Sequence, residues 1–228
     1  TGPSLELELM NYNRNKALVS DAAFRGGSPI RSGRIYAVVQ GDLNTGVAFS
    51  NPNSQSVVIN FNFADDSGNA LYTGQVTLAA GAKTSTFLSE SPLRPSTGIP
   101  LNRIRSFTFS ASAPIAAAAV RTLTNENGDF LIAVLPIADL SLPTQPVVLP
   151  FYADGGGWRS EIQLVNTTDS NLKGTVEFFP DLSGSASDLV YDIPPRSAVA
   201  IPTPGTGAQT KTGWARVSPN AGTANPAG

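Results

Sequence analysis

The stretch GVAFSNPNSQSVVINFNF, residues 46–63, decides the fold class of this chain. Its second half alternates apolar residues with asparagine, which is the period of a half-buried β-strand. The turn residues NPN at 51–53 separate this half from an apolar first half. Two short apolar runs joined by turn residues predict two consecutive strands.

The same pattern returns later in the chain. EIQLVNTTDSNLKGTVEFF, residues 161–179, matches the first stretch without gaps when Asn51 is placed opposite Asn166, a separation of 115 residues. The same separation also pairs Phe63 with Phe178, Asp66 with Asp181, Leu78 with Ile193, and Gly81 with Arg196. An ungapped match through several strands and turns predicts two copies of one structural module.

Candidate strands bounded by Gly, Pro, Asn and Asp recur along the first half of the chain, and no amphipathic helix is predicted. These strands are residues 34–39, 46–50, 57–63, 74–79, 84–89, 103–111, 115–123 and 130–137. The alanine run 116–119 follows Pro114 and precedes Val120, so a buried strand is favoured over a helix there. The fold class predicted is all-β.

The composition limits the classes of binding partner that can be expected. The chain has 228 residues, of which 41% are hydrophobic and 14% are charged, with a net charge of -2 and a pI of about 5.1. This balance argues against nucleic acid and anionic membranes as partners. No apolar run reaches the length of a membrane span, so membrane insertion is not expected.

The chain contains no cysteine and no histidine. Thiol nucleophiles, disulfides, thiolate metal sites and the Ser-His-Asp triad are therefore excluded, and no cofactor or metal is expected. The sequence begins at Thr1 without a leader pattern, which favours a mature or trimmed form. Together with the abundance of Thr, Ser, Asn and Gly, this predicts an extracellular or cell-surface bacterial protein.

The motifs TGVAFSNPNSQSVVINFNFADDSGN, VTLAAGAKTSTFLSE and FTFSASAPIAAAAVRT, with their partners in the second copy, resemble a β-sandwich repeat of large secreted proteins of environmental bacteria. The resemblance covers most of residues 35–218. It implies tandem immunoglobulin-like sandwiches on the cell surface or in the extracellular matrix. It implies no catalytic residues.

The predicted organisation follows from the two copies. Residues 1–33 form an N-terminal strand segment, 34–140 the first module, 141–150 a Pro-rich linker, and 151–228 the second module. The second module reaches the strand GWARVSP and is then followed by NAGTANPAG. Its last two strands are therefore expected to be missing, which would leave an apolar groove beside unpaired sheet edges.

The N-terminal stretch SLELELMNYN supplies a strand that the modules do not use. Leu5, Leu7 and Leu9 alternate with glutamates, and the polar run NRNK that follows gives no sign of a hairpin partner. This strand is the predicted donor that completes the second module. Residues 13–33 are long enough to bring it to the second module of the same chain, but completion of the second module of another copy is favoured. A head-to-tail contact of that kind does not close, so a homo-oligomeric filament or surface layer is expected.

The alternative function is an adhesin or carbohydrate-binding module with a polysaccharide partner. The loop YADGGGW, residues 152–158, places Trp158 after three glycines, where it could stack on a sugar or fold over the open end of the sandwich. Trp214 is expected to face the core, because it alternates with Arg216 along its strand.

The acidic residues raise two further hypotheses, calcium binding and glycoside hydrolysis, and neither is favoured. The loops 64–69 and 125–129 have the composition of calcium loops, but hairpin turns need the same residues and are preferred. A pair of carboxylates could serve glycoside hydrolysis, yet nothing in the sequence brings two of them together, so the chain is not expected to be an enzyme. The carboxylates considered are Asp154, Glu161, Asp188, Asp192, Glu126 and Glu177.

Overall fold

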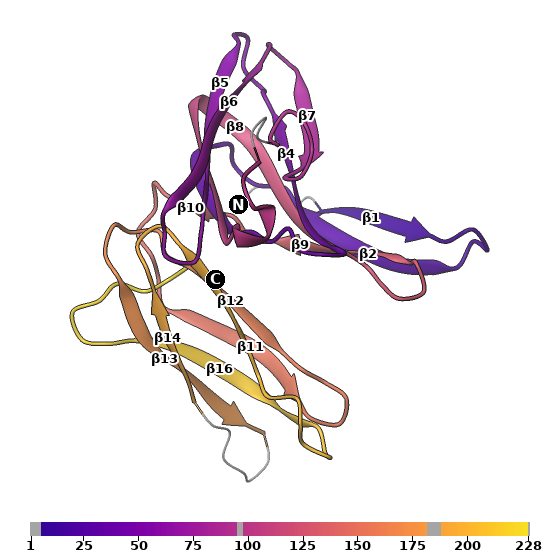
Figure 1. Cartoon of the computed structure of the whole chain (residues 1–228), viewed down its shortest axis with the longest axis vertical. Coiled ribbons are helices and arrows are strands. Elements are labelled where there is room, and N and C mark those ends of the chain that lie inside the picture. Colours follow the sequence, from indigo (N-terminus) through magenta and orange to yellow (C-terminus); the bar gives the residue numbers. More distant parts are fainter. Residues whose placement is uncertain (1–5, 95–97, 182–187, 228) are drawn as a thin grey trace. The chain divides into compact units, whose positions relative to one another are not determined.

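The computed structural model describes residues 6–94, 98–181 and 188–227. Antiparallel strands make up the fold, and the helical content of the described residues is one 3-10 turn, Leu101–Arg103 (Figure 1). The predicted all-β class is confirmed. The chain divides into two compact units: unit 1 runs to Ser141 apart from Asp66–Gly68, and unit 2 takes that stretch and the residues from Leu142 onward.

Unit 1 is built from two sheets that share one long strand. One sheet has the order β10–β3–β8–β5–β6 and the other β7–β4–β8–β9. The strands are β3 (Ile30–Tyr36), β4 (Leu43–Ser50), β5 (Val57–Ala64), β6 (Ala70–Leu78), β7 (Lys83–Phe87), β8 (Ser106–Thr124), β9 (Phe130–Leu135) and β10 (Ala138–Asp139). Apolar residues from both sheets form one core.

Strand β8 is continuous over 19 residues, although the sequence predicts two strands there. Its ladder with β5 ends at Ala111, and its ladder with β4 begins at Ala116. Pro114 lies between these two ladders, so its missing N–H removes no hydrogen bond from either. The proline therefore marks the crossing between sheets and not the end of a strand.

The core of unit 1 is rich in phenylalanine because strand alternation places those residues on one face. Phe61 and Phe63 are buried, while Asn60 and Asn62, which alternate with them, face outward. Their rings join those of three further residues from β4 and β8, namely Phe49, Phe107 and Phe109. This cluster holds the two sheets together through large buried apolar areas.

The expectation that the first strand lacks a hairpin partner is wrong. Strand β1 (Glu6–Tyr12) pairs along its whole length with β2 (Leu18–Arg25). The turn depends on Asn13, whose Oδ1 accepts hydrogen bonds from the backbone N–H groups of Asn15 at 2.9 Å and Ala17 at 3.0 Å. Lys16 has a positive φ of 63°. The run NRNK is thus a tight Asn-based turn.

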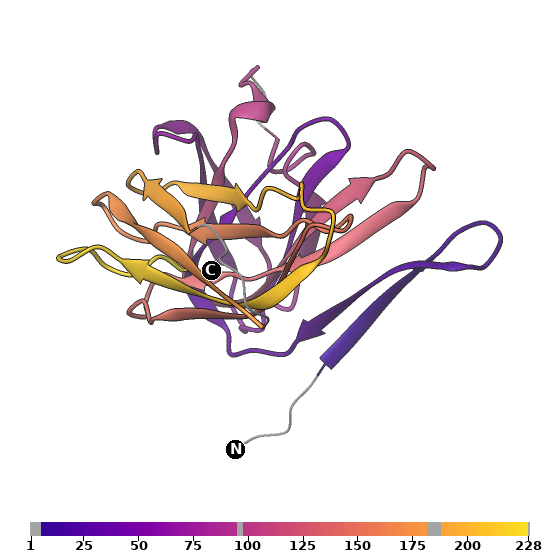
Figure 2. The ribbon, with the colours of Figure 1, turned by 90° about the horizontal axis from the view of Figure 1, so that it is seen from below.

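The hairpin β1–β2 is attached to β9 by side chains. Ser20 Oγ accepts a hydrogen bond from the N–H of Ile132 at 3.2 Å, and Asn11 Nδ2 donates to the carbonyl of Phe130 at 2.7 Å. Ala22 of β2 is buried. Figure 2 shows the tip of the hairpin extending away from the strands of unit 1.

Unit 2 has a larger and a smaller sheet around its own core. The larger sheet has the order β11–β16–β13–β14, and the smaller one pairs β12 with β15. The strands are β11 (Val147–Asp154), β12 (Glu161–Val165), β13 (Leu172–Pro180), β14 (Leu189–Ile193), β15 (Ala198–Pro202) and β16 (Lys211–Pro219).

The alignment of the two copies is confirmed by identical hydrogen bonds around Asn51 and Asn166. Asn51 Nδ2 donates to the carbonyls of Gln55, Leu78 and Ala79. Asn166 Nδ2 donates to the carbonyls exactly 115 residues further on, those of Ser170, Ile193 and Pro194. Both side chains are buried.

The match of Gly81 with Arg196 has a conformational cause. The two residues have φ values of 69° and 62°, in the left-handed region that favours glycine. Unit 2 tolerates arginine in this position, and its guanidinium pairs with Asp169 at 2.6 Å. The turn geometry is therefore kept although the residue type is not.

Three expectations about boundaries and orientation need correction. Strand β3 begins at Ile30, inside the segment 1–33, and β11 begins at Val147, inside the stretch 141–150 that was expected to be linker. Trp214 faces solvent with Arg216, because residues two apart on a strand share a face. Ala215 and Val217 point to the core instead.

Candidate functional site

The candidate site is the outer edge of β12 in unit 2. On one side β12 pairs with β15 through five residue pairs, Glu161 to Val165. On the other side, the described residues supply one bridge, in which Val165 and Ala227 exchange N–H···O bonds of 2.7 and 2.9 Å. The rest of that edge has no ladder partner within residues 6–94, 98–181 and 188–227.

The equivalent strand in unit 1 is fully paired. Strand β4 lies between β7 and β8, and its ladder with β8 runs through eight pairs from Leu43–Leu123 to Ser50–Ala116. The separation of 115 residues places Ser50 opposite Val165. The bridge at Ala227 therefore lies where the β4–β8 ladder begins in unit 1, and no described residue occupies the following positions of that ladder.

An open edge of this kind can bind another strand through its main chain. The side chains of β12 divide cleanly between its two faces: Ile162 and Leu164 are buried in the core, and Glu161 and Gln163 point outward. An incoming strand with apolar residues on one face and polar residues on the other would match this division.

The predicted donor residues lie on the hairpin of unit 1. Leu5 falls outside the described residues, whereas Leu7 and Leu9 on β1 are 66% and 48% exposed. Leu9 also lines an apolar groove of about 260 Å³ with Phe24 of β2 and Phe87 of β7. The outer edge of β1 has no ladder partner among the described strands.

Trp158 closes a tight turn and is exposed. Its N–H and carbonyl both bond to Gly155 at 2.9 Å, and Gly155, Gly156 and Gly157 all have positive φ values. The side chain is 62% exposed, so it does not cover the end of the sandwich. A nearby pocket of about 200 Å³ is lined by residues such as Tyr152, Asp154 and Lys211, and Trp158 is not part of it.

The acidic residues considered for glycoside hydrolysis are held by local partners. Hydrogen bonds from Arg216 and Ser218 lower the pKa of Glu177, and a hydrogen bond from Lys173 lowers the pKa of Asp192. Asp154 accepts the N–H of Gly205 at 2.7 Å. A general acid needs a raised pKa, so neither Glu177 nor Asp192 suits that role. Asp188 Oδ1 accepts the N–H of Phe178 at 3.4 Å, Glu161 Oε1 accepts the side-chain amide of Gln163 at 3.3 Å, and Glu126 is exposed on the turn 125–129.

The two acidic loops form turns. Asp65 Oδ1 accepts the N–H of Asn69 at 2.9 Å, and Asn125 Oδ1 accepts the N–H of Asp129 at 2.8 Å. Gly68 and Gly128 both have a φ of 79°. The structure brings no group of three or more Asp and Glu side chains into metal-binding proximity among the residues it describes.

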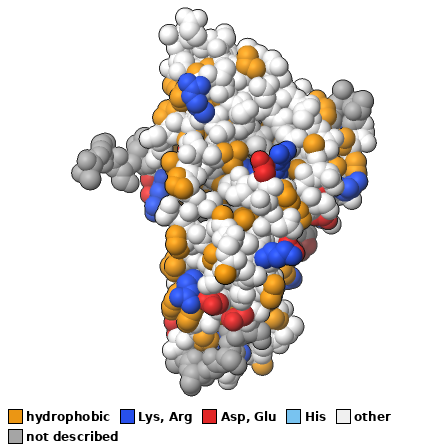
Figure 3. Space-filling model, turned by 90° about the vertical axis from the view of Figure 1, so that its left-hand side faces the viewer, with side chains coloured by type: hydrophobic (Ala, Val, Ile, Leu, Met, Phe, Trp, Pro, Cys, Tyr) orange, Lys and Arg blue, Asp and Glu red, His pale blue; other side chains and the backbone are white. Residues whose placement is uncertain are grey.

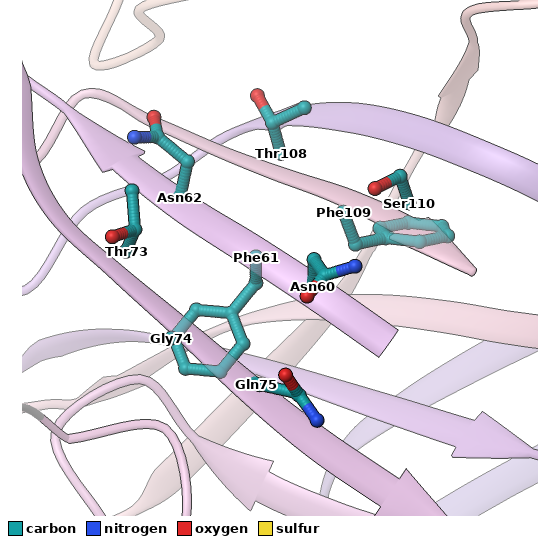
Figure 4. Close-up of a pocket in the computed structure, with 9 residues that line it drawn as sticks. All are labelled: Asn60, Phe61, Asn62, Thr73, Gly74, Gln75, Thr108, Phe109 and Ser110. Atoms are coloured by element: carbon teal, nitrogen blue, oxygen red, sulfur yellow. The ribbon is translucent and has the colours of Figure 1, made fainter. Parts of the chain in front are cut away.

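A polar hollow of about 460 Å³ lies on the outer face of β5, β6 and β8 (Figure 4). Hydroxyl and amide side chains surround it: Asn60, Asn62, Thr73, Gln75, Thr108 and Ser110. The ring of Phe61 lies against Gly74, where a Cβ would collide with it. Such a surface can form hydrogen bonds with uncharged polar ligands, but no buried unpaired group marks a defined site in it.

Charged side chains are sparse on the surface seen in Figure 3, where Lys, Arg, Asp and Glu stand apart among uncharged atoms. Hydrophobic side chains occur there in small groups. No helix among the described residues is long and apolar enough to cross a membrane.

Two tyrosines in unit 2 carry a testable pH dependence. The hydroxyls of Tyr152 and Tyr191 are buried and have no hydrogen-bond partner in the described part of the chain. Burial raises the pKa of both, and the negative charges of Asp181 and Asp154 raise that of Tyr152 further. An unfolded tyrosine loses its proton near pH 10. The stability that comes from keeping these two tyrosines neutral is therefore fully present below about pH 10, and it is lost as the pH rises through their raised folded pKa values.

We expect Tyr191→Phe to reduce the loss of stability at alkaline pH. At pH 8 the variant should be as stable as the parent or more stable by about 1 kcal/mol, because a buried unpaired hydroxyl is removed. Urea unfolding at pH 8 and at pH 11 measures the difference. An equal loss of stability in both proteins between these pH values would contradict the assignment.

Comparisons with known proteins identify no family. No protein-family model matches the chain, and no curated protein matches it. A solved structure titled "Crystal Structure of Thermotoga maritima 1070" is similar at 11% sequence identity and a TM-score of 0.37, covering 49% of this chain and 97% of the other. A likeness at that level supports no functional argument.

Proposed function

We propose that this chain is a non-catalytic extracellular structural protein that assembles head to tail by β-strand addition. Strand β1 of one copy joins the open edge of β12 in the next copy. The observation that carries the proposal is the contrast between β4, which is paired on both sides, and β12, for which the described residues supply one bridge on the outer side.

Strand addition would join two sheets that are each small. The hairpin β1–β2 and the pair β12–β15 have two strands each. Isolated two-stranded sheets are marginal in water, and a sheet of three or more strands with an apolar face is much more stable. Joining β1 to β12 makes a four-stranded intermolecular sheet, in which Leu7 shares a face with Ile162 and Leu164.

The contact is heterologous, since it joins different surfaces of the two copies. Each added copy presents a new open β12 edge, so growth continues as a filament unless a ring closes. The absence of cysteine and histidine and the low charged fraction support an extracellular structural role over an enzymatic one. The bacterial surface family suggested by the sequence motifs agrees with this proposal.

Deleting residues 1–13 tests the donor role. The truncated chain should be less stable and should form no fibres by negative-stain electron microscopy, whereas the full chain at high concentration should form them. Because the truncated chain keeps its β12 edge, it should also cap growing ends and shorten fibres when mixed with full-length protein. This capping distinguishes loss of the donor from simple misfolding.

Two point variants refine the test. Leu7→Asp should abolish assembly, because it places a charge on the apolar face of the donor, whereas Glu8→Gln on the opposite face should not. A full-length chain that remains monomeric at high concentration, or a truncated chain that still assembles, would refute the proposal.

The second candidate is an adhesin or carbohydrate-binding module that uses Trp158. The exposure of this side chain on a turn with two backbone hydrogen bonds favours it. Loss of binding to immobilised glycans in Trp158→Ala, with folding unchanged, would support this function.

A further inference from the structure

A row of aromatic side chains crosses the outer face of the larger sheet in unit 2. Trp214 on β16 is directly opposite Phe179 on β13. On the other side of β16, the ladder with β11 is interrupted between Leu149 and Tyr152, and this irregularity leaves Pro150 and Phe151 across from Trp214. Three adjacent strands therefore contribute one aromatic residue each, over a width of about 10 Å.

The centre of the row is held in place by neighbouring side chains. The rings of Phe179 and Trp214 stack with centroids 4.0 Å apart and planes 7° apart, and the Arg216 guanidinium lies 5.4 Å from the Phe179 centroid. Glu177 holds Arg216 through contacts of 2.6 and 2.8 Å and accepts the Ser218 hydroxyl at 2.9 Å. A surface fixed in this way loses little entropy on binding.

The core does not require these aromatic residues. The opposite face of the sheet is filled by Ala215, Val217 and Phe178, all buried. Cross-strand stacking stabilises a sheet, which explains the Phe179–Trp214 pair. It does not explain Phe151, which is 67% exposed in the irregular stretch. Exposed aromatic groups on a regular surface are typical of a binding site.

Two pairs of opposite charges on this face favour an uncharged ligand. Arg216 pairs with Glu177, and Lys173 pairs with Asp192 at 2.9 Å on the same face. A face without excess charge does not attract nucleic acid or an ionic polymer. Aromatic rings with hydrogen-bonding side chains beside them suit the apolar C–H face and the hydroxyl groups of a pyranose ring.

We propose that the row Phe151–Trp214–Phe179 binds a neutral polysaccharide chain laid across the strands. This takes up the carbohydrate-binding alternative and rests on it, but places the site on the sheet face and not on the Trp158 turn. Trp214 is the central contact, Phe151 extends the row at one end, and Arg216 and Glu177 provide hydrogen bonds to hydroxyl groups.

Pull-down on microcrystalline cellulose and on chitin, with heparin-agarose as an ionic control, tests the proposal. The protein should be retained by at least one neutral polymer and not by heparin. Trp214→Ala and Phe151→Ala should each weaken retention about tenfold, the equivalent of 1.4 kcal/mol. Trp158→Ala and Val190→Ala, which alter other exposed apolar side chains of unit 2, should leave retention unchanged.

Folding and assembly are separated from binding in the same experiment. Trp214→Tyr should keep most of the retention, because it keeps an aromatic ring, and circular dichroism checks that each variant is folded. The chain lacking residues 1–13 should be retained as strongly as the parent when retention is calculated for each copy of unit 2, whatever its state of assembly. Retention by neither neutral polymer, or a loss confined to Trp158→Ala, would overturn the proposal; the second result would instead support the Trp158 site.

Discussion

Replacing Phe107 with alanine is expected to lower the free energy of unfolding of unit 1 by about 4 kcal/mol. The side chain is fully buried on β8 and its ring lies 5.5 Å from that of Phe63 and 5.9 Å from that of Phe61. Rings from both sheets surround it, so removing it leaves a cavity that neither sheet can close alone. Urea unfolding at neutral pH measures the effect.

The matched control is Phe151→Ala in unit 2. Phe151 is largely exposed, so its removal should change stability by less than about 0.5 kcal/mol. A loss below about 2 kcal/mol for Phe107→Ala would mean that the aromatic cluster repacks, and the two sheets would then be less tightly held than the structure indicates.

Replacing Asn51 or Asn166 with alanine is expected to cost the unit that contains it about 3 kcal/mol. Each side chain is buried and donates to three carbonyls, and its Oδ1 accepts the N–H of the residue two positions later, Asn53 or Thr168, at 2.9 and 2.8 Å. Alanine leaves these buried groups without partners, and each unpaired group costs about 1–3 kcal/mol.

The location of the loss is as informative as its size. Hydrogen exchange should report lost protection in unit 1 for Asn51→Ala and in unit 2 for Asn166→Ala, and the double variant should be additive because the two sites share no partner. Asn60→Ala, on the polar outer face, should have little effect. A loss of protection spread evenly over both units would contradict two independently stabilised repeats.

Much of this fold could be predicted from the alternation of apolar residues. Strand β5 was predicted within one residue, because Val57, Ile59, Phe61 and Phe63 alternate with outward-facing residues without a break. The repeat was equally visible, because the turn chemistry of Asn51 recurs at Asn166. Both patterns involve residues that are close together in the sequence, so they can be recognised in a single sequence without knowledge of the fold.

The predictions that were wrong concern strands whose structure depends on the strands they pair with. The pairing of β1 with β2 is not evident from the sequence because NRNK is a polar, basic run, although an asparagine that bonds to the backbone just after it begins many tight turns. The sequence predicts two strands, 103–111 and 115–123, in place of β8, because the point where β8 crosses between sheets depends on ladders with distant strands.

The candidate sites were only partly visible. Comparison of the two copies pointed to the edge of β12, which has one bridge on its outer side among the described residues, whereas it did not point to the aromatic row. Phe151 and Phe179 stand in runs of apolar residues, LPFYAD and VEFFP, where sequence cannot say which one faces outward. The orientation of Trp214 was available, since a residue two positions from Arg216 shares its face.

Strand β8 also makes unit 1 differ from unit 2 in how it would carry a mechanical load. In unit 1 a force along β8 is shared by ladders in both sheets at once, since the same strand belongs to both. In the described part of unit 2, β16 belongs to the larger sheet alone, and β12 is held by five pairs with β15 and one bridge. We therefore expect the smaller sheet of unit 2 to separate first under tension. A strand added at β12 would reinforce the protein at that sheet.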